Sequence, residues 1–144
     1  RAQVSIGTLR NYAQDPEFGL QNLTEIGQRA LSPGINDPGT AVDMLRRVSR
    51  VLLGARPAQD EDREVLYDRL HVRTLPRGQI VLDTIGGILR HGLDQPEVLA
   101  AGRQSLEALV GQGDREIADA ARRLLTELDE KQEQSLFAAG SGAP

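Results

Sequence analysis

The chain has 144 residues and a net charge of −4; 39% of its residues are hydrophobic, but only 3% are aromatic. This length suffices for one domain with a core of Leu, Ile, Val and Ala, which favours packed helices over a β-sandwich. The acidic balance argues against nucleic acid or an anionic membrane surface as the main partner, and the lack of cysteine excludes disulfides, thiolate metal sites and a Cys nucleophile.

The first half of the chain predicts a short strand and two helices. Val4 and Ile6 alternate with polar residues, as in a strand. Asp15-Pro16 and Asp37-Pro38 each place a capping carboxylate before a proline at the first helical position. Apolar residues then recur at helical spacing, and we expect the two helices to pack through Leu23, Ile26, Ala30, Met44, Leu45 and Val48.

The second half predicts three more helices after an exposed acidic linker. A small β-hairpin is expected over Val65–Thr74, with a helix as the alternative. The third helix carries apolar residues from Ile80 to Leu89, and Gly86-Gly87 should loosen it. Asp94 is expected to cap the fourth helix, which has Pro96 in its first turn.

The fifth helix is expected to bury a stripe from Ile117 to Leu128. We expect residues 1–136 to form a single helical domain and residues 137–144 a disordered tail. The predicted fold class is therefore mainly α: an irregular bundle of about five helices, with a short N-terminal strand and a small β-hairpin.

The turn from Ser32 to Thr40 is the strongest candidate for a site. The helix that follows has free N–H groups that attract anions, and the predicted ligand-binding residues are Arg29, Ser32, Asn36, Asp37 and Thr40. The competing interpretation is structural, and we favour it. Asp37 would then occupy the helix N-terminus as a cap, and the prolines and glycine would fix the angle between the helices.

Metal binding and catalysis find little support in the sequence. The spacing of the hard oxygen ligands that could suit Mg²⁺ or Ca²⁺ matches no known metal-binding loop. These residues are Asp15, Glu25, Asn36, Asp37 and Asp43. Neither of the two histidines, His71 and His91, has a nearby Ser nucleophile with an evident relay. We therefore predict no catalytic residue, metal or cofactor.

Two further groups of charges have simple interpretations. Arg46, Arg47 and Arg50 share a polar helix face that is either solvated or a docking strip for an acidic partner. The pairs Glu127/Lys131 and Asp114/Arg115 are interpreted as ordinary surface charge.

A dense motif supports a family resemblance. It consists of Ile6-Gly7, Arg10, the run from Gln14 to Leu20, Ile26, the run from Arg29 to Pro38, and Thr40-Ala41. These residues resemble an uncharacterised family of bacterial predicted membrane proteins, domain-of-unknown-function family 2254. A weaker second motif covers Ile85 to Gly92. The sequence departs from the expected pattern at Gly39 and at Gly27-Gln28.

The resemblance implies several transmembrane helices upstream, so we expect this chain to be a fragment: the soluble C-terminal part of a membrane protein, on the cytoplasmic side. The favoured function is a non-catalytic domain acting in oligomerisation, partner docking or regulation, and the expected partners are a second copy of the chain and the upstream membrane segments. The alternative is a small-ligand or anion-binding domain, or an enzyme, centred on the Ser32–Thr40 turn. A third hypothesis, that the chain is the regulatory gate of a channel or transporter, is based on the resemblance alone.

Overall fold

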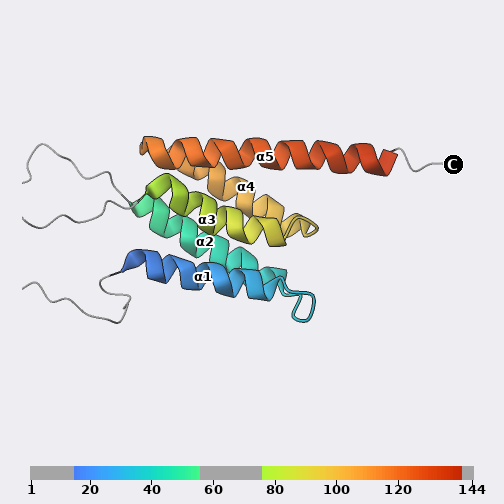
Figure 1. The fold of residues 1–144 in the computed structure, drawn as a ribbon, viewed down its shortest axis with the longest axis horizontal. Coiled ribbons are helices and arrows are strands. Elements are labelled where there is room, and N and C mark those ends of the chain that lie inside the picture. The colour runs from blue at the N-terminus through green and yellow to red at the C-terminus, as the bar shows by residue number, and fades with distance from the viewer. Residues whose placement is uncertain (1–14, 56–75, 141–144) are drawn as a thin grey trace, which may run out of the picture.

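A computed structural model describes residues 15–55 and 76–140 of the chain, and these form five α-helices (Figure 1). The helices are α1 (Pro16–Ala30), α2 (Pro38–Gly54), α3 (Arg77–His91), α4 (Pro96–Val110) and α5 (Arg115–Gly140). The five helices of the predicted, mainly α fold are confirmed, and the described residues contain no strand. The expected strand at Val4–Ile6 and the hairpin at Val65–Thr74 lie outside the described residues.

The helices pack into one bundle in which sequence neighbours run in opposite directions. Helix α1 packs against α2 and α3, α2 also packs against α4, and α5 packs against α3 and α4. A single aliphatic core joins all five, with fully buried side chains at Leu45, Val48, Ile85, Leu106, Leu109 and Ile117. The α1–α2 loop (residues 31–37) and the α3–α4 loop (residues 92–95) lie at the same end of the bundle, which we call the loop end (Figure 1).

The predicted starts of the first two helices are confirmed. Asp15 accepts a hydrogen bond from the N–H of Phe18 at 2.9 Å, Asp37 accepts one from the N–H of Thr40 at 3.0 Å, and a proline begins each helix. The prediction for α4 was wrong, because Gln95 rather than Asp94 is its N-cap residue and no side chain caps it. Pro96 takes the first helical position, so Asp94 stands one residue too early to cap.

The expected packing of α1 through Ile26 was also wrong. Ile26 is 48% exposed, and the inward face of α1 holds Leu20, Thr24, Gly27 and Ala30 instead. A Cβ atom on Gly27 would lie 2.9 Å from Ile88 Cδ1 and 3.3 Å from Met44 Cβ. The missing side chain at Gly27 therefore lets α1 approach α2 and α3 closely. With Gly27 facing these helices, the preceding residue, Ile26, points about 100° away around the helix and faces solvent.

The α3 glycines form close contacts instead of a loose segment. Gly86 and Gly87 are both buried. A Cβ atom on Gly86 would meet Leu124 of α5, and one on Gly87 would meet Gln28 and Thr24 of α1. Two neighbouring helices thus use the space that these glycines leave.

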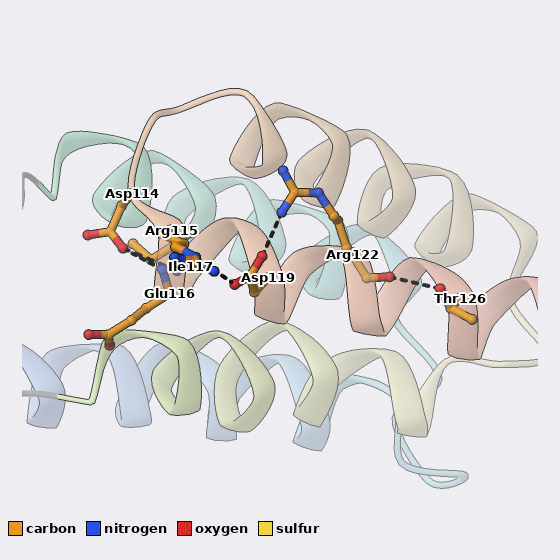
Figure 2. A network of polar contacts seen from close by, with 7 residues as sticks. All are labelled: Asp114, Arg115, Glu116, Ile117, Asp119, Arg122 and Thr126. Atoms are coloured by element: carbon orange, nitrogen blue, oxygen red, sulfur yellow. Dashed lines mark hydrogen bonds and ion pairs between the residues drawn. The ribbon is translucent and has the colours of Figure 1, made fainter.

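The start of α5 corrects another prediction, because Asp114 is not a surface charge. Asp114 is only 3% exposed, and its Oδ1 accepts hydrogen bonds from the N–H groups of Glu116 and Ile117 at 3.0 and 3.3 Å (Figure 2). Its Oδ2 lies 3.0 Å from Arg77 Nε. These two atoms are buried and attract each other as an ion pair, without hydrogen-bond geometry. One carboxylate therefore caps α5 and holds the first turn of α3 beside it.

Beyond the buried Leu128, α5 continues to Gly140. The first four residues of the expected tail (137–140) are helical, and the last four lie outside the described residues.

Candidate functional site

The backbone of the α1–α2 loop is closely bonded, as its prolines and glycine predict. Ser32 O accepts hydrogen bonds from the N–H groups of Ile35 and Asn36 at 3.0 and 2.9 Å. The Asp37 N–H donates to Ala30 O at 2.8 Å, across the loop. Asn36 has a φ of 48°, in the left-handed region that Asn tolerates better than most residues. The loop thus has a defined path into α2.

Asp37 and Thr40 are engaged with each other at the start of α2. Thr40 donates to Asp37 twice, from its hydroxyl to Oδ2 at 2.6 Å and from its N–H to Oδ1 at 3.0 Å. The hydroxyl bond, and then the backbone bond, lower the pKa of the Asp37 carboxyl below its ordinary value of 3.8. This N-terminus already holds a negative charge, which disfavours an added anion there.

The other three predicted residues face a different space. Arg29, Ser32 and Asn36 line an open groove of about 800 Å³ at the loop end, which we call the polar groove. The α3–α4 side of this groove is formed by His91, Asp94 and Gln95. Glu25 and Gln28 of α1 also line it. The predicted set is therefore divided between a groove and a helix cap.

One hydrogen bond joins the two loops at the rim of the polar groove. Gln95 Nε2 donates to Asn36 Oδ1 at 3.3 Å, across a sequence separation of 59 residues. His91 Nδ1 lies 3.0 Å from Gly87 O, and because a carbonyl only accepts, Nδ1 carries the proton. The bond orients the imidazole ring with its Nε2 atom available.

Sequence reasoning missed the contribution of the α3–α4 loop. The sequence predicts a cap role for Asp94 and no catalytic relay for His91, and neither prediction relates these residues to the Ser32–Thr40 turn. No periodicity or cap signal links them to Asn36, because their meeting depends on how α1 and α3 cross. Arg10, which belongs to the family motif, lies outside the described residues.

The polar groove offers both signs of charge. Arg29 makes no ion pair with any residue that the structure describes, and Glu25 and Asp94 supply carboxylates. Within residues 15–55 and 76–140, no three His, Asp or Glu side chains gather to hold a metal ion. The lining suits a polar or zwitterionic partner that presents several hydrogen-bonding groups.

A second groove of about 410 Å³ lies between α4 and α5 and shares Asp94 with the polar groove. Its lining is mostly apolar, so we call it the apolar groove; it includes Leu93, Pro96, Leu99 and Leu128. Ile35 and Leu93 are 55% and 40% exposed. The two loops of the loop end thus each expose a large apolar side chain.

The sequence also matches known proteins. The profile of a family described as "Predicted membrane protein (DUF2254)" matches residues 1–108, which include α1 to α3 and most of α4. The chain belongs to this family. The resemblance inferred from the Ile6–Ala41 motif is thereby confirmed, although the family description names no activity.

Relatives in the DUF2254 family extend beyond this chain. An uncharacterised protein of Mycobacterium tuberculosis and one of Mycobacterium bovis are each 36% identical over 111 residues, which is 74% of this chain and 21% of each relative. The chain thus spans about a fifth of the length of these relatives. No solved structure is significantly similar to it. None of the helices described for this DUF2254 chain has both the length and the apolar character to cross a membrane.

Proposed function

We propose that this chain is a non-catalytic docking and regulatory domain of its parent membrane protein, and that the loop end receives the partner. The observation that carries the proposal is the arrangement at the loop end: two adjoining grooves, one polar and one apolar, that share Asp94. An apolar groove bordered by polar residues is typical of surfaces that bind another polypeptide.

The rigidity of the loop end supports docking. The Asn36–Gln95 bond, the bonded α1–α2 loop and the Asp37 cap hold both loops before a partner arrives. A surface fixed in advance loses little conformational entropy on binding. The cytoplasmic side of the membrane remains part of the proposal and rests on the resemblance alone.

Photo-cross-linking in the full-length parent protein in native membranes tests the docking proposal. A photoreactive residue at Ile35 or Leu93 should yield a discrete cross-linked product. The control is Arg115, which begins α5 at the opposite end of the bundle and whose side chain is 94% exposed. Equal products at all three positions, or none at Ile35 and Leu93, would refute loop-end docking.

A second candidate function is the binding of a small polar ligand in the polar groove. It is favoured by Arg29, Ser32 and Asn36 lining one space with both acidic and basic neighbours. Free amino acids and dipeptides carry the matching pair of charges and serve as probes. NMR titration should shift the Arg29, Ser32 and Gln95 amides, and Arg29→Gln should abolish the shifts in a normally folded protein. Spectra that do not change at millimolar concentrations would exclude this function for these probes.

A further inference from the structure

The last part of α5 leaves the bundle. Among the α5 residues whose burial the structure describes, Leu128 is the last in the core, and residues 129–134 are all exposed. Arg103 of α4 binds Asp129 and Gln132 at the point of departure. From there the helix continues to Gly140 and extends past the α3–α4 loop (Figure 1). The twelve residues after Leu128 span about 18 Å. Helices in proteins gain most of their stability from packing one face against other elements, so this extension of α5 would be stabilised by a surface to pack on. We call residues 129–140 the α5 arm.

The α5 arm is acidic. Its charged residues are Asp129, Glu130, Lys131 and Glu133, of which Asp129 is occupied by Arg103. Glu130 and Glu133 lie one helical turn apart, and neither forms an ion pair with a cation in the described ranges. The arm thus presents two carboxylates at helical spacing that have no ion-pair partner in residues 15–55 and 76–140.

The outer face of α2 carries the opposite charge, in the form of arginines. Arg46 and Arg50 are exposed, one turn apart, and no acidic residue of the described chain pairs with either. Arg47 is already paired with Asp43, the only acidic residue of α2. Val51 and Leu53, in the last turns of the same helix, are 49% and 42% exposed. We call Arg46, Arg50, Val51 and Leu53 the α2 face: basic in the middle and bordered by apolar side chains.

Within one copy the two surfaces are kept apart. Helix α2 packs mainly against α1, α3 and α4, whereas α5 packs against α3 and α4. The α5 arm extends beyond the loop end, while the second half of α2 leads toward the other end of the bundle (Figure 1). The acidic α5 arm and the basic α2 face, whose charges have similar helical spacing, can therefore contact each other only between two molecules.

We infer that the α5 arm of one copy lies along the α2 face of a second copy. If each copy gives its arm to the other, two identical contacts close a symmetric dimer. The arm gains a packing surface, and Leu53, which lies on the same side of α2 as Arg46 and Arg50, loses its exposure to water. This contact uses a different surface from the loop-end docking proposal, so either can fail without the other.

The contact should be weak in dilute solution. Each exposed ion pair contributes little, and the apolar area beside the arginines is small. Copies that share one membrane are held at a high local concentration, which favours weak contacts between them. Association should therefore be measured over a wide range of concentration and at low ionic strength.

Sedimentation equilibrium of the 144-residue chain tests the inference through charge reversal. The wild type should shift from monomer to dimer as concentration rises. Arg46→Glu with Arg50→Glu should weaken the dimer roughly tenfold or more, as should Glu130→Arg with Glu133→Arg, because each creates like-charge contacts. All four changes together should restore association. Circular dichroism confirms that each variant is folded.

The matched control is Arg122→Glu with Arg123→Glu, which changes the net charge equally on the part of α5 that packs on the bundle. This control should leave the dimer intact. The inference is overturned by a wild type that stays monomeric at every concentration, by a control that weakens the dimer as much as the α2 variant, or by a combined variant that does not recover. A monomer that binds phosphatidylglycerol vesicles through Arg46 and Arg50 would assign the α2 face to lipid and would also overturn it.

Discussion

Asn36 illustrates how a single residue fixes the path of the α1–α2 loop. It is the one non-glycine residue with a positive φ in the described ranges, at 48°. Asn accepts this conformation more readily than residues whose Cβ crowds the backbone, and glycine accepts it freely. Its side chain also accepts the bond from Gln95. Its backbone role and its position in the polar groove can be separated by substitution.

Replacing Asn36 should therefore have unequal effects on stability. Asn36→Ala should lower the free energy of unfolding by about 1 kcal/mol, because Ala is strained at this φ. Asn36→Gly removes the same side-chain contacts but keeps the backbone path, so its free energy of unfolding should be close to that of the wild type. Urea denaturation measures both. Equal losses in the two variants would show that the Gln95 contact, and not φ, limits stability.

The environment of Asp37 determines how its contribution to folding stability should change with pH. Its pKa is lower in the folded chain than the ordinary 3.8, chiefly because the Thr40 hydroxyl donates to it. A carboxyl with a depressed folded pKa stabilises the protein above its unfolded pKa, and this contribution is lost as pH falls through the folded value. Asp37→Asn retains a capping oxygen but does not titrate.

The wild type should therefore lose more stability than Asp37→Asn between neutral pH and about pH 2.5. Urea unfolding midpoints at several pH values measure the difference, and the remaining carboxylates titrate in both proteins. Parallel pH profiles would contradict the assignment of a depressed pKa to Asp37.

At the scale of elements, α3 and α5 are tied together where both begin. Asp114 caps α5 and pairs with Arg77 of α3, while Gly78 lets α3 approach the α5 backbone. A Cβ atom on Gly78 would lie 2.9 Å from the carbonyl oxygen of Glu116. Because a backbone atom cannot rotate away, the approach depends on glycine at this position.

Removing the shared carboxylate should weaken the bundle. Asp114→Ala leaves two N–H groups of α5 uncapped and the buried Nε of Arg77 unpaired, so we expect a loss of about 2 kcal/mol or more. Asp119→Ala is the control, because Asp119 is exposed and its pairs with Arg115 and Arg122 lie on the surface; it should change stability by less than about 0.5 kcal/mol. Thermal unfolding compares the two, and similar losses would refute the role of Asp114.

The close approach of α3 and α5 gives a further prediction. Gly78→Ala should cost about 1–3 kcal/mol even though Ala favours helix, because the added carbon meets the Glu116 carbonyl. Gly54→Ala, at the open end of α2, meets nothing within 4 Å and should be neutral or stabilising by up to about 1 kcal/mol. Denaturant titration of both variants tests this, and a stabilised Gly78→Ala would mean that the helices move apart easily.

For the whole molecule, the one aliphatic core predicts cooperative unfolding as a single domain. Leu45 is fully buried in this core, and Leu45→Ala should lower stability by about 2–5 kcal/mol. Leu53 lies on the same helix but is 42% exposed, so Leu53→Ala should lower stability by less than about 1 kcal/mol. Scanning calorimetry should give one transition, with equal calorimetric and van't Hoff enthalpies. Two transitions would divide the chain into separate units.

The sequence by itself determined the features that depend on neighbours a few residues apart. The Asp-Pro pairs fixed the starts of α1 and α2, the apolar spacing marked the buried stripes of α3 and α5, and the family motif from Ile6 to Ala41 placed the chain among predicted membrane proteins. Capping bonds reach only three residues and a helical stripe repeats every three or four, so both are visible in a short window.

Only the tertiary structure decided which local signals are used, and how. It buried Asp114, left Ile26 in solvent, and joined Asn36 to Gln95 across 59 residues. These outcomes depend on the rotation and crossing of whole helices, which close contacts at Gly27 and Gly78 set. A glycine in the sequence shows that a close approach is permitted; the side chain that fills the space belongs to another helix, and no local pattern identifies it.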